Sequence, residues 1–192
     1  MGRPREFDLD ERLDLALRVF WRHGYEGAAL SDLTEAMGIS RPSLYAAYGN
    51  KESLFRKVVD HYLAGPASHL RDAAGEATGR AAVERLLRGA VAVVTARDHR
   101  GCLVIQGALA TGKQADPARA ELVARRRAAT DRLRERLERA RVDGELGADV
   151  DTAALAGFVT TVSYGLSVQA TDGATPEELH AVVDVAMSAW PG

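Results

Sequence analysis

Residues 31–48 read SDLTEAMGISRPSLYAAY, and this stretch decides the fold of the N-terminal part of the chain. Its spacing predicts two short helices, over about residues 31–37 and 40–48. Gly38 lies between them, and glycine readily takes the left-handed conformation that ends a helix. Pro42 fits the first turn of the second helix, where no helical hydrogen bond is lost. The pattern is that of a helix-turn-helix.

The two short helices can lock together and leave one face of the second helix exposed. Their contact is predicted to be a small apolar wedge of Leu33, Ala36, Met37, Ile39 and Leu44. Arg41, Ser43 and Tyr45 then lie outside, at the N-terminal end of the second helix. That end can meet base edges in a DNA groove while its backbone amides favour phosphate. Since many helical bundles contain a helix-glycine-helix pattern, a protein-interaction module is an alternative to DNA binding.

Apolar residues along the rest of the chain recur at spacings of three and four, with no convincing alternating strand. The chain is therefore predicted to be all-α, with about nine helices. A helix-turn-helix domain over residues 1–50 is expected to lead into a connecting helix over 51–64. Residues 65–192 are expected to form a second helical domain. Within it, residues 73–82 suggest a loose connection, and a long helix is predicted over 116–142.

The composition bounds the class of protein. With 46% hydrophobic and 27% charged residues among 192, the chain can bury a core, which excludes a disordered tail protein. The single cysteine, Cys102, excludes an internal disulfide and indicates a reducing compartment. The first residues contain no apolar run typical of a secretory signal, so a cytoplasmic location is expected. The net charge of −2 argues against general coating of nucleic acid, but residues 40–51 contain Arg41 and Lys51 and no acid.

Two segments each allow two interpretations. Residues 152–171 form a twenty-residue run without a formal charge, long enough to span a bilayer. Their many hydroxyl side chains and two glycines favour a helix buried between protein surfaces, so no membrane contact is expected. Residues 125–141 contain eight arginines, a run that could form a nucleic-acid patch. Acidic residues interleave with these arginines at helix-pair spacings, which favours a solvated face with ion pairs.

Residues 3–62 resemble the DNA-binding domain of the TetR family of bacterial transcriptional regulators. The shared features are an Arg-Pro-Arg leader at 3–5, VFWRHGY at 19–25, MGIS at 37–40, SLY at 43–45 and YGNKESLF at 48–55. The resemblance implies a sequence-specific DNA-binding regulator, and by family habit a repressor. It also implies which residues meet the duplex: in or beside the major groove Arg41, Pro42, Ser43 and Tyr45, and on the flanking phosphates Tyr48 and Lys51.

Two features of this segment bear on how tightly DNA is held. Ala46 and Ala47 stand where many relatives carry a basic residue or histidine, so fewer phosphate contacts are expected. Arg3 and Arg5 form a leader that either reaches a neighbouring groove or stays solvated at the terminus. One monomer with so few base contacts would bind weakly, which predicts two copies on one duplex.

The last two predicted helices are the candidates for pairing with a second copy. Their candidate interface residues, a small-residue repeat at four-residue spacing and the apolar residues around it, are Gly157, Phe158, Thr161, Gly165, Leu179, Val183 and Met187. Periodicity leaves open whether these faces are instead buried inside the monomer. The TetR resemblance implies a homodimer, paired through a four-helix bundle of the C-terminal helices, and a palindromic operator.

Residues 101–107 are uncharged and contain small residues, so they are predicted to form either the wall of a ligand cavity or simply a closely packed helix, which the sequence favours. The candidate ligand-binding residues are Cys102, Gln106 and Tyr164, with Tyr62 and His69 as weaker candidates. The TetR resemblance implies a small-molecule effector that releases the protein from its operator. Such release is a population shift toward a dimer state that no longer fits the duplex.

No catalytic or metal site is expected. Cys102 lies near Asp98 and His99, and a thiolate paired with an imidazole can be a nucleophile. Neighbouring positions in sequence do not make a triad in space, however, and no oxyanion arrangement is recognisable. The five histidines are scattered without metal-ligand spacing. The expected protein is therefore not an enzyme and uses no cofactor.

Overall fold

Helices make up the regular structure of the described residues, which are 9–96, 101–107 and 116–191 of this computed structural model. Their bounds are α1 Leu9–Gly27, α2 Leu30–Ala36, α3 Arg41–Tyr48, α4 Lys51–Ala64, α5 His69–Asp72, α6 Gly79–Val94, α7 Leu103–Gln106, α8 Asp116–Val142, α9 Thr152–Thr171 and α10 Pro176–Ser188. The all-α prediction is confirmed. The four-residue helix α5 was not anticipated from the sequence. Helix α6 begins inside the predicted loose connection, because Thr78 caps it with its side-chain oxygen.

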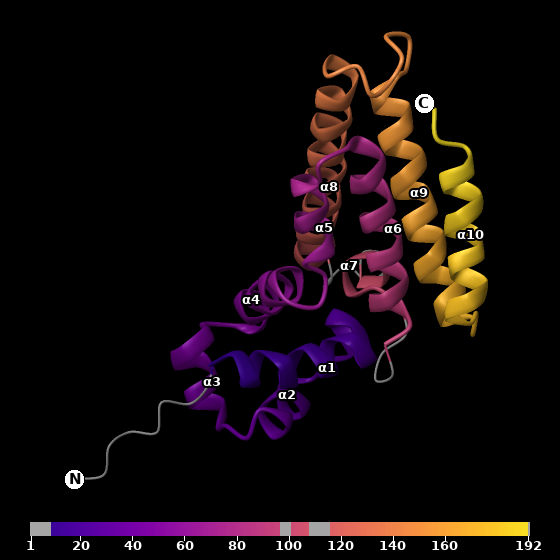
Figure 1. Cartoon of the computed structure of the whole chain (residues 1–192). Helices are drawn as coiled ribbons and strands as arrows, with labels where there is room; N and C mark the ends of the chain where they lie inside the picture. Colours follow the sequence, from indigo (N-terminus) through magenta and orange to yellow (C-terminus); the bar gives the residue numbers. More distant parts are fainter. Residues whose placement is uncertain (1–8, 97–100, 108–115, 192) are drawn as a thin grey trace.

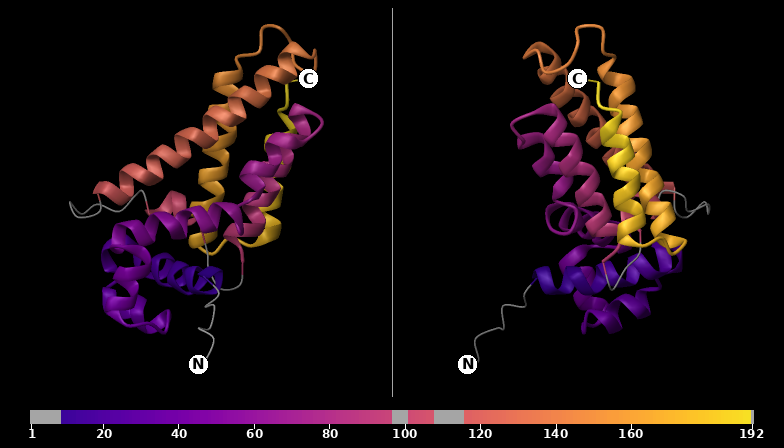
Figure 2. Two further views of the ribbon diagram at one scale, coloured as in Figure 1. Left: turned by 90° about the vertical axis from the view of Figure 1, so that its left-hand side faces the viewer. Right: turned by 45° about the vertical axis from the view of Figure 1, so that its right-hand side comes forward.

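The helices form two parts that meet at α4 (Figure 1). The first three helices lie together at the bottom of that view, α4 lies across them, and the remaining long helices rise above. Helix α1 packs against α2 and α4, α9 packs against both α6 and α8, and α10 packs against α6 and α9. Figure 2 shows the long helix α8 running obliquely across this upper bundle. The lower end of α8 reaches α4, so the two parts are in direct contact.

Two clusters of buried apolar side chains stabilise these two parts. The lower cluster contains aromatic pairs in edge-to-face geometry, with ring centroids 5.0 Å apart for Phe20 and Phe55 and 5.1 Å apart for Trp21 and Tyr62. The upper cluster is built from aliphatic side chains of α6, α8, α9 and α10. Cys102 packs against both clusters, so the segment that leads into α7 connects the two cores.

The helix boundaries of the N-terminal part follow local sequence signals. Gly24 kinks α1 near its end, with φ of 67°, and Gly38 ends the turn after α2 with φ of 61°. Both angles lie in the left-handed region that glycine takes without steric cost. Ser40, Asn50 and Thr175 cap their helices by accepting a backbone N–H with their side chains, and serine, asparagine and threonine are residue types preferred at this position.

Helix α9 is long and apolar enough to cross a membrane by length and composition, with a mean hydropathy of 1.2. A core helix passes the same test, and α9 packs one side against α6, α8 and α10. The prediction of a helix buried between protein surfaces holds for that side only. Phe158 and Val168, on the other side, are 45% and 46% exposed.

Candidate nucleic-acid interface and ligand cavity

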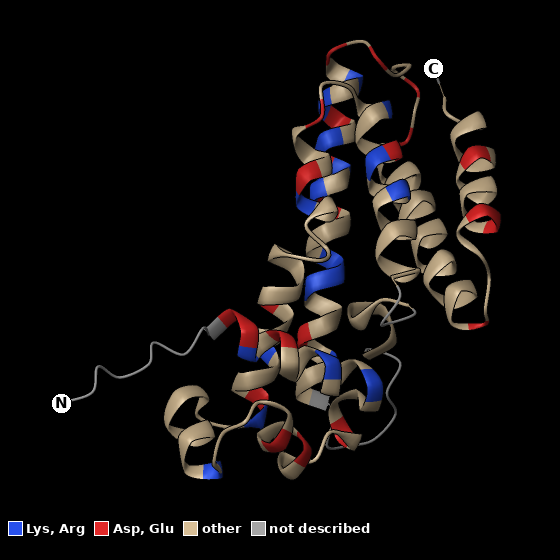
Figure 3. Cartoon of the chain, turned by 60° about the horizontal axis from the view of Figure 1, so that its bottom comes forward, with Lys and Arg blue, Asp and Glu red and all other residues tan. Residues whose placement is uncertain are grey.

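Helix α3 is held by its inner face and presents its outer face to solvent. Leu33 of α2 and Leu44 of α3 are both fully buried, which fixes the two helices against each other. On the outer face Arg41, Pro42 and Ser43 are exposed, and the side chain of Tyr45 is 47% exposed. Helix α3 contains no acidic residue, and in Figure 3 it is tan with blue only at its N-terminal end. The outer face is therefore suited to approach a polyanion.

The turn before α3 is fixed by hydrogen bonds from two sides. The Ile39 amide donates to the Thr34 carbonyl at 3.0 Å, and Arg12 of α1 donates from its guanidinium to the Met37 carbonyl at 2.9 Å. The Ser43 amide donates to the Ser40 hydroxyl oxygen at 3.2 Å. Because these bonds tie α3 to α1 and α2, its outer face is rigidly oriented by the three-helix unit.

Lys51 stands at the first position of α4, beside the end of α1. Its ammonium nitrogen lies 4.7 Å from the centroid of the Tyr25 ring and donates a 3.4 Å hydrogen bond to the Glu26 carbonyl. Burial lowers the pKa of Lys51, and the Glu26 carboxylate partly offsets this. The amine remains half exposed, so a phosphate could reach it at a helix N-terminus, where backbone amides already favour anions.

Tyr48, in contrast, does not face solvent. Its side chain is 6% exposed, and its hydroxyl is buried without a hydrogen-bond partner in the described part of the chain. Burial raises the pKa of this hydroxyl, so the phenol stays neutral. The expectation that Tyr48 contacts phosphate is therefore wrong in this structure. The residue anchors α3 to the core, because it lies four positions after Leu44 on the same inner face.

A cavity of about 100 Å³ lies among α4, α5, α6, α8 and α9. A single water needs roughly 10–15 Å³ on the same measure, so this space can hold a small organic molecule. Cys102 and Tyr164 line the cavity, as do the weaker candidates Tyr62 and His69. Gln106 does not: it lines a separate hollow among α1, α4 and α7. Its predicted ligand role is corrected, because α7 turns that side chain toward the lower part of the molecule.

The Cys102 thiol is a structural group in this arrangement. The Tyr62 hydroxyl donates to its Sγ at 3.2 Å, and the Cys102 amide donates to the Ser167 hydroxyl oxygen at 2.8 Å. Burial raises the pKa of the thiol, so it stays protonated, whereas a nucleophilic cysteine needs a lowered pKa. Asp98 and His99, the proposed partners in a catalytic interpretation, lie outside the described residues, as do Arg3 and Arg5 of the N-terminal leader.

The sequence favours a single solvated face for the arginines of α8, but the structure divides them between solvent and the cavity. Four of them line the cavity, namely Arg125, Arg126, Arg132 and Arg136. Arg136 is 5% exposed and donates to the Glu76 carbonyl at 3.1 Å. The sequence contains a signal for this inward position, because Arg126 and Arg136 fall on the same helical stripe as the inward leucines Leu122 and Leu133.

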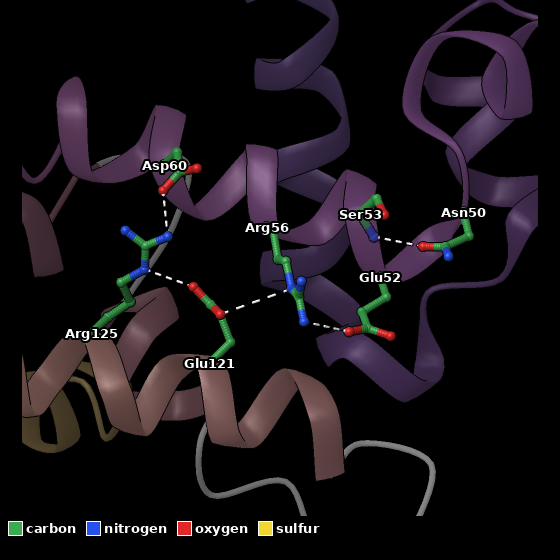
Figure 4. Close-up of polar contacts among 7 residues, drawn as sticks. All are labelled: Asn50, Glu52, Ser53, Arg56, Asp60, Glu121 and Arg125. Atoms are coloured by element: carbon green, nitrogen blue, oxygen red, sulfur yellow. Dashed lines mark hydrogen bonds and ion pairs between the residues drawn. The ribbon is translucent and has the colours of Figure 1, made fainter.

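Ion pairs connect the cavity wall to α4 (Figure 4). The Arg125 guanidinium lies 2.7 Å from Asp60 of α4 and 2.8 Å from Glu121. Glu121 in turn lies 3.9 Å from Arg56 of α4, which pairs with Glu52 at 2.7 Å. Arg125 also lines the cavity, so this network of ion pairs joins the cavity wall to α4.

The predicted pairing residues divide into two groups. Leu179, Val183 and Met187 of α10 are buried at 0%, 0% and 5% exposure, because α10 packs this stripe on α6 and α9 of its own chain. These three are therefore wrong as contacts with a second copy. On α9, Phe158 and Thr161 are exposed, and a side chain added at Gly157 or Gly165 would meet nothing within 4 Å.

Exposed apolar side chains also occur on α10, at Val182 and Val185, which are 37% and 70% exposed. Together with Phe158, Thr161, Gly165 and Val168 of α9 they are called the α9–α10 face below. Exposed valines on a helix are unfavourable for an isolated monomer when they cluster. Among the described residues, no group of three or more side chains suited to hold a metal ion is found.

Comparison with known proteins identifies the class. A model of the bacterial regulatory proteins of the tetR family matches residues 13–58. A second model, described as tetracyclin repressor-like, C-terminal domain, matches residues 79–186. The chain belongs to the TetR family of bacterial regulatory proteins, as the sequence resemblance implied.

Individual relatives match over nearly the whole chain. The HTH-type transcriptional repressor ComR of Escherichia coli (strain K12) is 33% identical over 195 residues, covering 99% of this chain and 92% of ComR. The repressor BdcR of the same organism is 29% identical, covering 96% of this chain and 90% of BdcR. A cysteine mutant of the TetR family regulator CifR, solved in complex with a 26-bp double-strand operator DNA, is 48% identical with a TM-score of 0.91, covering 98% of this chain and 100% of CifR.

Proposed function

We propose that this chain is a transcriptional repressor that binds a palindromic operator as a homodimer and is released by a small-molecule effector. The observation that carries the proposal is the exposed, acid-free outer face of α3, rigidly held by α1 and α2. ComR and BdcR are named as transcriptional repressors, and CifR is seen on operator DNA, which supports the same activity here. Residues 1–50 serve as the DNA-binding domain, with residues 65–192 for effector binding and pairing.

The proposed contacts follow from exposure and chemistry. Arg41, Ser43 and Tyr45 meet base edges from the N-terminal half of α3, with Pro42 beside them at the groove. Lys51 gives a phosphate contact from the start of α4. Residues 1–62 contain nine basic and ten acidic side chains, a net charge of −1. Affinity therefore depends on this local surface and not on the domain as a whole.

The homodimer is supported by the α9–α10 face. It is largely apolar, exposed in one copy and open at Gly165, so a second copy can approach closely. Pairing would cover a side of α9 that has the composition of a membrane-crossing helix, and so we propose that this side faces protein and not lipid. A two-fold axis through the face would place two α3 helices in successive major grooves, about 34–36 Å apart. A cytoplasmic location and the absence of enzyme activity complete the proposal.

The effector role is supported by the connection between the cavity and the DNA-binding part. The cavity wall includes Tyr62 of α4 and Arg125, which pairs with Asp60 of the same helix. An occupant that moves this wall would move α4, and α4 carries Lys51 at its other end. The spacing between the two α3 helices would then change, which lowers operator affinity by population shift.

Selection of duplexes from a random pool tests the proposal directly. The selected sequences are expected to be inverted repeats. Lys51→Ala should weaken binding to the selected duplex and to unrelated duplexes alike. It should also lower the slope of log affinity against log salt concentration by about 1. Tyr45→Ala should weaken the specific site by about 1–3 kcal/mol and leave non-specific binding nearly unchanged.

Arg80→Ala is the matched control, because it removes an exposed cation at the start of α6, far from α3. Anisotropy titrations at two salt concentrations give all of these values. Recovery of sequences without two-fold symmetry would contradict the dimer, and equal effects of all three variants would contradict the assigned surface. Loss of binding to every duplex in a folded protein would favour a protein-interaction module.

A further inference from the structure

The wall of the cavity combines an apolar surface with one sign of charge. Most of its described lining residues are aliphatic, such as Leu86, Val94 and Leu133. The same wall contains five arginines and, among the described residues, no aspartate or glutamate. An apolar wall lowers the local dielectric constant, so an uncompensated positive charge beside it is costly without a counter-charge. The charge on each arginine therefore needs to be accounted for.

Three of the five arginines are paired outside the cavity. Arg125 has Asp60 and Glu121 at 2.7 and 2.8 Å. Arg136 lies 3.8 Å from Glu145 and donates to a backbone carbonyl, and Arg71 lies 3.4 Å from Asp72. These partners lie outside the cavity wall, so these three guanidiniums are compensated without any occupant.

Arg126 is different. Its guanidinium carbon lies 5.6 Å from the centroid of the Tyr164 ring, and both residues line the cavity. The side chain is half-buried, and it makes no ion pair or hydrogen bond with another described residue. Arg132, two turns further along α8, is likewise without an ion pair in the described part of the chain but is exposed. Contact with an aromatic face leaves the edge of a guanidinium free to donate two parallel hydrogen bonds.

We propose that this cavity binds an organic anion with an apolar body, whose head group pairs with Arg126. The inference rests on the proposed effector role of the cavity and names the chemical class of the effector. The aliphatic wall covers the body, and the guanidinium edge receives the oxygens of the head group. Carboxylates and phosphate monoesters share this chemistry, because both present two oxygens at the spacing of the arginine fork.

His69 supplies a neutral hydrogen-bonding group on the same wall. Its Nδ1 is buried and has no partner among the described residues. Burial lowers the pKa of His69 to about 4, so the ring is uncharged at neutral pH. The imidazole can therefore bond an oxygen of the head group without adding a second cation, which leaves Arg126 as the group that selects for charge.

Isothermal titration calorimetry with a matched series tests the class of ligand. The probes are saturated carboxylates of four to twelve carbons, with the alkyl phosphate, the primary amide and the alkylammonium ion of each length. The proposal expects an anion to bind at least about 10-fold more tightly than the amide of the same length, and the cation more weakly still. The better of the two anions identifies the head group. Equal binding of amide and anion, or no binding of any anion, would overturn the proposal.

A pair of neighbouring variants tests the residue. Arg126→Gln should lower anion affinity by about 10- to 100-fold and change amide affinity little. Arg127→Gln is the matched control, because Arg127 is exposed on α8 and does not line the cavity. Equal losses in the two variants, with both folded by circular dichroism, would contradict the assignment of Arg126.

Operator binding, measured separately on the selected duplex without any ligand, distinguishes the two proposals. A protein that binds anions through Arg126 but binds no duplex would support the anion site and refute the repressor. A protein that binds the duplex but no anion would do the opposite. Release of the duplex by the anion from the wild type, and much less from Arg126→Gln, would support both.

Discussion

His69 is a residue whose ionisation the fold changes strongly. The side chain packs so closely on Gly89 of α6 that a Cβ there would lie 2.5 Å from the His69 Cβ. Burial lowers its pKa from 6.5 to about 4, an effect that Asp72 opposes and Arg85 adds to. The unfolded chain therefore binds more protons than the folded chain between these two pH values, so stability falls as the pH is lowered through this window.

We expect the wild type to lose about 2 kcal/mol of unfolding free energy between pH 7 and pH 5 from this group alone. His69→Gln should lose correspondingly less over the same interval, because glutamine does not titrate. Urea unfolding of both proteins at the two pH values gives the difference. Parallel losses in the two proteins would show that the imidazole titrates as it does in the unfolded chain.

At the scale of elements, a single buried hydroxyl joins the start of α7 to α9. Ser167 is fully buried and accepts the Cys102 amide at 2.8 Å. Ser167→Ala would leave that amide without its partner, which costs about 1–3 kcal/mol. Ser188→Ala is the control, because that exposed hydroxyl only donates to the carbonyl of Val185 in its own helix. Thermal or urea unfolding that ranks the two variants equally would contradict a structural role for this bond.

The elements also show what the sequence could and could not predict. The caps at Ser40, Asn50 and Thr175 were predictable, because each depends on residues within one turn. The burial of Tyr48 was predictable in the same way, because Tyr48 lies four positions after the inward Leu44, although the TetR resemblance implied a phosphate contact. The inward position of Arg126 follows from the apolar stripe of α8 that contains Leu122 and Leu133, and the spacing of the charges alone does not report it. The acidic residues interleaved with the arginines correctly predicted an ion pair for Arg125, which pairs with Glu121. They did not predict that the neighbouring Arg126 lines the cavity.

At the scale of the whole molecule, α4 is the element through which the two ends can influence each other. It contacts α1 and α3 below and α8 above, and it contributes Tyr62 to the cavity. Its ion pairs with α8 are partly exposed, and such pairs contribute little stability. Because these ion pairs between α4 and α8 are specific but weak, α4 can change its position relative to α8 at a small cost in free energy. This arrangement favours α4 as the moving part, and not α9, which packs against α6, α8 and α10.

Pairing of two copies is the part of the proposed function that can be tested at the α9–α10 face. Phe158 lies on the α9–α10 face and is 45% exposed, whereas Val142 at the end of α8 is 75% exposed and lies outside that face. Phe158→Glu would bury an unpaired carboxylate at the predicted contact, which costs several kcal/mol. We therefore expect it to convert a dimer to a monomer in light scattering and to abolish tight operator binding, because one α3 helix makes too few contacts. Val142→Glu introduces the same charge at a more exposed apolar position outside the face and should leave the dimer and its DNA affinity unchanged. A Phe158→Glu protein that stays dimeric would move the interface elsewhere, and a monomeric wild type would require that one copy binds the operator.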